Sequence, residues 1–152
     1  MAKVNLPDKA ITYTVATILG SQLMNKGQYN EAKEFYLDAL EGRRRVLWEE
    51  NKGTVMSLYN FGNLLRHTDD YGGALDYYLQ APRVQGKILR KTHPHTLDTI
   101  TCMAIVYGDG LGDRVKDEEM QRLALDNYEK SLGEEHEDMK HCAFVLAMLL
   151  RE

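Results

Sequence analysis

Apolar residues recur at intervals of three and four along almost the whole chain, as expected for helices with one buried face. No stretch alternates apolar and polar residues with period two, so no sheet is expected. The spacing therefore predicts an all-α fold. It comprises about seven helices, near residues 8–25, 29–50, 54–67, 71–91, 94–107, 115–132 and 137–150.

Residues that start or stop helices set the predicted boundaries. Asp8 and Thr54 are suitable N-caps, and Gly27 ends the first helix. Pro82 lies inside the fourth helix and should bend or interrupt it, because proline removes one backbone donor. A glycine-rich loop is expected after the fifth helix, at Gly108, Gly110 and Gly112.

One helical segment occurs twice in the chain. Residues 28–40, QYNEAKEFYLDAL, return as residues 70–82, DYGGALDYYLQAP, 42 positions later. The first helix of each pair aligns on a small residue at spacings of 42, 42 and 43: Gly20, Gly62, Ala104 and Ala147. Asp117 replaces the alanine of the second helix in the third pair, so that packing contact should be lost or altered. A fixed period of this length predicts a solenoid of helix pairs.

Residues 27–40 of the second helix read Gly-x-Tyr-x-x-Ala-x-x-x-Tyr-x-x-Ala-Leu. The first helix of each pair has a large apolar residue, then a small residue, and then Leu or Tyr three positions later. This pattern resembles the tetratricopeptide repeat, and the 42-residue period with the segment His-Pro-His-Thr at 93–96 is similar to the kinesin light chain type. The resemblance implies a right-handed superhelix of antiparallel pairs in a single domain over 1–152. Its repeats would lie at about 8–50, 54–91 and 94–133, with an unpaired last helix at 137–151.

The resemblance also implies that the first helices line a concave groove that binds partner peptides. By register, the groove candidates are Thr17, Ser21, Met56, Tyr59, Asn60, Asn63, Arg66, Asp98, Thr101, Cys102 and Ile105. Kinesin light chains carry an Asn-Asn pair on these helices. Of that pair, only Asn60 is present here.

Composition narrows the classes of partner. The 152-residue chain has a net charge of −4 and a pI near 5.7, which gives no reason to expect nucleic-acid binding. The longest apolar run, 142–150, is far shorter than the ~20 residues of a membrane helix. Cys102 and Cys142 lack metal or redox spacing, so we expect reduced thiols in a cytoplasmic protein.

Candidate catalytic and metal-binding residues are few. His93 and His95, with Cys102 on the next helix, could suggest a metal, but a metal site needs three or four converging ligands and a repeat turn is favoured. His136 and His141 are interpreted in the same way. The basic run at residues 43–45 is expected on a solvated helix face, with an anion contact as the alternative. No cofactor, metal or enzymatic activity is expected.

Two functions remain open. The first is a non-catalytic scaffold that binds a peptide or helix in the groove. The second is self-association through the last helix, as a homodimer or as part of a longer array, because that helix has no covering neighbour. The candidates for self-association are Phe144, Val145, Met148 and Leu149.

Overall fold

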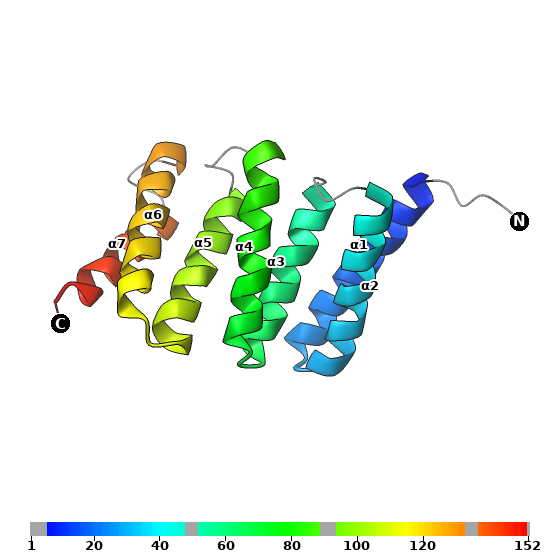
Figure 1. Cartoon of the computed structure of the whole chain (residues 1–152), viewed down its shortest axis with the longest axis horizontal. Helices are drawn as coiled ribbons and strands as arrows, with labels where there is room; N and C mark the ends of the chain where they lie inside the picture. The colour runs from blue at the N-terminus through cyan, green and yellow to red at the C-terminus, as the bar shows by residue number, and fades with distance from the viewer. Residues whose placement is uncertain (1–5, 48–51, 89–93, 133–136, 152) are drawn as a thin grey trace, which may run out of the picture. The chain divides into compact units, whose positions relative to one another are not determined.

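The structure is a computed structural model that describes residues 6–47, 52–88, 94–132 and 137–151. These residues form seven α-helices and one short π-helix, η1, and no strand (Figure 1). The elements are α1 (Leu6–Asn25), α2 (Tyr29–Leu47), α3 (Lys52–His67), α4 (Tyr71–Ile88), α5 (Pro94–Ile105), η1 (Val106–Gly110), α6 (Arg114–Leu132) and α7 (Glu137–Leu149). The predicted all-α fold is confirmed.

Several predicted boundaries were wrong. Asp8 and Thr54 lie inside α1 and α3, which begin two residues earlier, so neither caps its helix. Pro82 does not interrupt its helix, since α4 continues to Ile88, and the bend given as the alternative stays a prediction. The predicted C-terminal ends of the second and fourth helices, at 50 and 91, fall outside the described residues.

The chain divides into two compact units, Met1–Val84 and Gln85–Glu152. In the first unit, α2 packs against both α1 and α3, and neighbouring helices run antiparallel (Figure 1). In the second unit, α6 packs against both α5 and α7. Each unit therefore buries its core between successive helices. The prediction of one domain over 1–152 stays a prediction.

The turn inside each helix pair uses the same backbone geometry. Gly27, Asp69 and Gly112 adopt left-handed φ angles of 75°, 60° and 66°. At the first turn, Gln28 N donates to Leu23 O and Gly27 N to Met24 O, which are the two bonds of a Schellman motif. Asp70 N and Asp69 N make the equivalent bonds at the second turn. The repeat period is therefore reproduced in the backbone of the turns.

A glycine allows the two helices of a pair to approach closely. A Cβ atom at Gly20 would lie 2.8 Å from the ring of Tyr36, and one at Gly62 would lie 2.6 Å from the ring of Tyr78. The third pair has Ala104 at this position, 42 residues after Gly62, and Gln121 in place of the tyrosine. Ala104 and Gln121 are both buried. The third pair therefore has a larger residue in place of glycine and a smaller one in place of tyrosine.

The extra residue of the third pair lies in η1. Predicted as loop, Gly108 and Gly110 instead belong to the π-helix, and the left-handed turn follows at Gly112. A π-helix accommodates one additional residue by widening the hydrogen-bonded turn. Here Asp113 N bonds to Tyr107 O at 2.7 Å, one residue further than in the other turns.

The register of α7 differs from the predicted one. Its buried residues are Cys142 and Leu146, which follow Ile100 and Ala104 of α5 by 42 positions. Ala147, aligned at a spacing of 43, is exposed. The spacing between the buried residues of α5 and α7 is therefore 42 again, although η1 contains an additional residue.

We expect Gly62→Ala to destabilise the protein although alanine favours helices. The new methyl group would collide with Tyr78, and overpacking of this kind costs about 1–3 kcal/mol. Gly72→Ala, in the first turn of α4, is the matched control, because no atom lies within 4 Å of its Cβ position and the substitution should not lower the stability. Thermal unfolding of both variants measures the difference.

The third pair supplies a further control for this experiment. If the collision with Tyr78 causes the loss, Gly62→Ala should cost clearly less in a Tyr78→Gln background, which reproduces the alanine–glutamine combination. An equal cost in both backgrounds would contradict the packing explanation.

Candidate interaction surface

Two tyrosine hydroxyls fix polar side chains on the first helices of the first unit. Tyr36 Oη lies 2.9 Å from Ser21 Oγ, and Tyr78 donates to Asn63 Oδ1 at 2.7 Å. These two contacts are 42 residues apart at both ends. Burial raises the pKa of Tyr36, so the phenol remains neutral. Two of the groove candidates, Ser21 and Asn63, are therefore held in place from α2 and α4.

The other candidates on α3 extend along the same helix. Met56 is exposed, while Tyr59 and Asn60 are half-buried. Tyr59 lies beside Tyr78, with ring centroids 6.3 Å apart. Within the described residues, the Asn60 amide makes no hydrogen bond. Met56 and Asn60 are one helical turn apart, so they offer an apolar and a polar contact close together.

Thr17 takes part in a buried network and is not available as a groove residue. Arg43 donates to Thr17 Oγ1 at 3.0 Å, to Ser57 Oγ at 2.5 Å and to Gly53 O at 3.1 Å from Nη1. Its Nη2 donates to Thr14 Oγ1 at 3.3 Å. The guanidinium thus links α1, α2 and α3 of the first unit.

The solvated face predicted for Arg43 was wrong, since only 6% of this residue is exposed. Arg44 and Arg45 are exposed, as predicted. Sequence spacing could have found the difference, because Ala32, Tyr36, Ala39 and Arg43 follow one another at helical intervals along the buried stripe of α2. In the part of the chain that the structure describes, no carboxylate contacts Arg43, and burial lowers the pKa of its guanidinium.

Arg66 marks the end of α3. Its Nη2 lies 3.1 Å from His67 Nε2, and the His67 ring stacks on Tyr29 of α2 at a centroid distance of 6.4 Å. Burial and the nearby Arg66 charge lower the pKa of His67. The imidazole is therefore neutral at physiological pH and can accept a hydrogen bond from Arg66.

The candidates of the second unit are half-buried residues of α5: Asp98, Thr101, Cys102 and Ile105. Ile105 occupies the position of Ser21 and Asn63, and Gln121 occupies that of the two tyrosines. With no polar group at Ile105, the contact seen in the first unit cannot form. Gln121 Oε1 is buried and has no hydrogen-bond partner among the described residues.

A buried carboxyl group lies beside Gln121. Asp117 Oδ1 accepts from Gln121 Nε2 at 3.5 Å, and its Oδ2 lies against Gly108, where a Cβ atom could not fit. Burial raises the pKa of Asp117, and the charge of Asp109 raises it further. The sequence predicted that the packing contact at Asp117 would be lost or altered. In the structure it is replaced by a buried polar pair, Asp117 and Gln121, which residue spacing alone could not predict.

The exposed face of α7 forms a shallow pocket in the second unit. Phe144 is 64% exposed, and the pocket beside it has a volume of about 300 Å³. It is lined by Asp109, Arg114, Asp117, Phe144, Val145, Met148 and Leu149. All four self-association candidates therefore line one pocket, together with three charged residues from η1 and α6.

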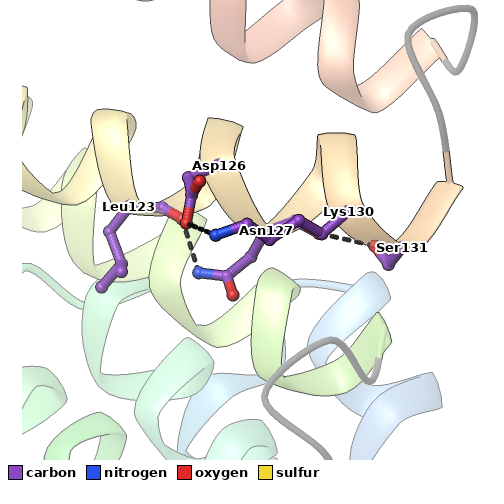
Figure 2. Close-up of polar contacts among 5 residues, drawn as sticks. All are labelled: Leu123, Asp126, Asn127, Lys130 and Ser131. Carbon is purple, nitrogen blue, oxygen red and sulfur yellow. Dashed lines mark hydrogen bonds and ion pairs between the residues drawn. The ribbon is translucent and has the colours of Figure 1, made fainter.

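Several polar side chains of α6 bond to other residues of the same helix (Figure 2). Asn127 Nδ2 donates to Leu123 O at 2.7 Å, and Ser131 Oγ donates to Asn127 O at 2.8 Å. Lys130 pairs with Asp126 one turn away, at 2.6 Å. These side chains stabilise the end of α6 and give no indication of a ligand.

Other candidate chemistry is not assembled in the described ranges 6–47, 52–88, 94–132 and 137–151. They contain no cluster of three or more metal-ligating side chains, and His93 and His136 lie outside them. Cys102 is half-buried, Cys142 is buried, and the two are not joined in a disulfide. No helix in these ranges is long and apolar enough to span a membrane.

The fold and the repeated tyrosine contacts define a class of helical-repeat proteins, the all-α solenoids built from helix pairs. A family model for the tetratricopeptide repeat matches residues 10–85, half of the chain. The chain therefore belongs to the tetratricopeptide repeat family. No curated protein matches it by sequence.

Solved structures confirm the fold at low sequence identity. BtubC (BKLC) from P. vanneervenii has a TM-score of 0.87 at 15% identity, over 99% of this chain and 59% of that one. A Podosopora anserina protein with nearly identical, kinesin light chain-type TPR-like repeats has a TM-score of 0.79 at 20% identity, over 91% of this chain and 65% of that one. The apo form of RapI has a TM-score of 0.80 at 18% identity, over 95% of this chain and 38% of that one. The chain thus spans less than two thirds of these proteins.

We expect Asp117→Asn to raise the thermal stability at pH 7. Because burial raises the folded-state pKa, the ionised carboxylate destabilises the fold above that pKa, and the cost disappears below the unfolded value near 3.8. The amide keeps the shape without the charge. The melting temperature should rise by a few degrees, about 2–4 °C per kcal/mol, at pH 7 and stay unchanged at pH 3.

Asp113→Asn is the matched control of opposite sign. The backbone N–H of Lys116 donates to Asp113 Oδ1, and this bond lowers the pKa of Asp113. Its carboxylate therefore stabilises the fold above the unfolded pKa, and the substitution should lower the melting temperature at pH 7. A loss of stability in Asp117→Asn at pH 7 would contradict the assignment of Asp117 as a buried, destabilising charge.

Proposed function

We propose that this chain is a non-catalytic protein-interaction scaffold that binds a peptide or helix on the first helices of its repeats. Membership of the tetratricopeptide repeat family supports a protein-binding role in general. The surface that we assign lies in the first unit, on α1 and α3. We also infer a cytoplasmic location, since two cysteines that form no disulfide with each other suit a reducing compartment.

The observation that carries the proposal is that α3 has one polar side chain held by a hydrogen bond close to another that makes none within the described residues. Tyr78 holds Asn63 in place, while Asn60 makes no hydrogen bond within the described residues and Met56 is exposed beside it. A pre-ordered polar group loses little entropy on binding, and an exposed apolar neighbour adds buried area. An extended peptide or an amphipathic helix could use both contacts.

The half-buried residues of α5 form the second part of this proposal. Asp98, Thr101, Cys102 and Ile105 present one acidic, two weakly polar and one apolar side chain. Because Ile105 replaces the fixed polar residue of the other repeats, this surface should contribute less hydrogen bonding to a peptide. We assign the first unit as the principal binding surface.

The combined substitution of Met56→Ala and Asn60→Ala should weaken binding about tenfold or more, the equivalent of about 1.4 kcal/mol. A partner captured from lysate and identified by mass spectrometry provides the peptide, whose Kd is then measured by calorimetry. We omit Asn63 from the variant because its loss would also leave the Tyr78 hydroxyl without its acceptor.

The control pair is Asp76→Ala with Leu79→Ala, two exposed positions on α4. It should bind as the unmodified chain does. If this pair weakens binding and the α3 pair does not, the site lies on the second helices and the proposal is wrong.

A second candidate function is self-association through α7. It is favoured by the exposure of Phe144 and Met148, two large apolar side chains one turn apart, beside a pocket. Exposed apolar surface of this kind commonly marks an interface. Light scattering across protein concentration tests it, and a chain that remains monomeric throughout would exclude it.

A further inference from the structure

Arg43 lies between the two helices that carry the proposed peptide-binding surface. It belongs to α2 and is buried, and its Nη1 donates to Thr17 Oγ1 of α1 and to Ser57 Oγ of α3. In the first unit, α1 and α3 contact each other much less extensively than each contacts α2. The position of α1 relative to α3 therefore depends on α2, and Arg43 is a residue of α2 that bonds to both.

The bonds of Arg43 end at the residues of the proposed surface. Its Nη2 donates to Thr14 Oγ1, and Thr14 is exposed. Met56 follows Thr14 by one 42-residue repeat and directly precedes Ser57 in the chain. One bond therefore ends at the α1 counterpart of Met56, and another ends one residue from Met56 itself.

The bridge depends on several donors that diverge from one side chain. Among the described residues, the acceptors of Arg43 are three hydroxyl oxygens and one carbonyl oxygen. Thr17 Oγ1 donates its own proton to Tyr13 O at 2.8 Å, so towards Arg43 it is an acceptor. The planar guanidinium carries five N–H donors in a rigid fork, whereas a lysine has one ammonium group. An arginine can thus bond to both helices at once.

The same repeat position joins helices in the second unit. Tyr128 of α6 follows Arg43 by two repeats, allowing for the additional residue of η1. It is buried in one core cluster with Ile100 of α5 and Cys142 of α7. A residue of the second helix thus joins the first helix of its own pair to that of the next pair in both units, with a guanidinium in one and a phenol ring in the other.

We propose that Arg43 is a positioning residue of the peptide-binding surface, which fixes the spacing of α1 and α3 and does not contact the peptide. A fixed spacing holds Ser21 on one helix and Asn60 on the other in a single arrangement. Pre-organisation of this kind lowers the free-energy cost of binding. The inference rests on the proposed peptide-binding function and names the residue that pre-organises its surface.

A direct attraction between the charge of Arg43 and an acidic peptide is the alternative role. The two roles differ in whether a lysine can replace the arginine. Lysine keeps the positive charge, but its single ammonium lacks the fork that bonds to both helices. Positioning therefore requires arginine, whereas attraction of an acidic peptide requires only a cation.

Pulsed EPR between spin labels at Gln22 of α1 and Met56 of α3 measures the spacing without any peptide. Both positions are exposed, and Cys102→Ser with Cys142→Ala removes the native thiols from the labelled chain. We expect one narrow distance distribution when Arg43 is present. Arg43→Met and Arg43→Lys should both broaden it, because neither side chain holds the two helices together.

Removal of an acceptor tests the same bridge while the arginine stays in place. Ser57→Ala should broaden the distribution to a smaller extent, since the bond from Arg43 to Gly53 O remains. Added to Arg43→Met, it should broaden the distribution no further, because the bridge is already lost. Circular dichroism checks the helix content of each variant. If both Arg43 variants lose helix, Ser57→Ala decides, and an unchanged distribution in it would contradict the proposal.

The matched control is Arg44→Met, which makes the same substitution at the neighbouring residue. Arg44 is exposed and bonds to Gln80 of α4 at 2.6 Å, so its loss should leave the spacing of α1 and α3 unchanged.

The peptide captured from lysate is the probe for the second measurement, by calorimetry on the unlabelled chain. Arg43→Met and Arg43→Lys should each raise its Kd about tenfold, and Arg44→Met should not change it. If Met56→Ala with Asn60→Ala leaves the Kd unchanged, the proposed function is wrong, and the EPR distances still decide whether Arg43 fixes the two helices.

Three results would overturn the proposal. The first is an unchanged distance distribution in a folded Arg43→Met variant. The second is an Arg43→Lys variant that binds the peptide as tightly as the unmodified chain does, which would assign Arg43 to charge attraction. The third is equal broadening in Arg44→Met, which would show that the spacing does not depend on the bonds of Arg43.

Discussion

The volume available where the first and second helices of a pair cross is the constraint on which this structure depends. At Gly20 and Gly62 the absence of a Cβ atom leaves room for the rings of Tyr36 and Tyr78. Because each ring lies against its glycine, its hydroxyl reaches the next residue of the first helix, Ser21 or Asn63. The missing Cβ atom at each glycine therefore explains both the close approach of the two helices and the orientation of the Ser21 or Asn63 side chain.

The third pair shows how this constraint is met with different residues. Ala104 adds a methyl group where the tyrosine is replaced by Gln121, and Gly108 removes a side chain where the small residue is replaced by Asp117. At both positions a change of size on one helix is thus matched by an opposite change on the other. The chemistry changes from a phenol with a partner to a buried carboxyl beside an amide whose oxygen has no partner among the described residues. The fold tolerates the exchange because packing depends on volume, whereas the polar groups differ in what they can bind.

Helices, pairs and period could be predicted from the sequence because they depend on spacing, which the residues display directly. The buried position of Arg43 was missed because three consecutive arginines indicate a solvated face, while its place on the stripe of Ala32, Tyr36 and Ala39 indicates burial. The exposure of Ala147 was missed because an additional residue can lie in a loop or in a π-helix, and composition does not distinguish them. Partner identity could not be predicted, since the repeat specifies a surface and leaves its ligand to individual side chains.

Helix α1 presents two kinds of surface on different residues. Its Ser21 is held by Tyr36 and belongs to the surface shared with α3, whereas Ile11 and Val15 form part of an exposed apolar stripe. The same helix therefore holds one polar side chain in a fixed orientation through one set of residues and exposes apolar side chains through a second set.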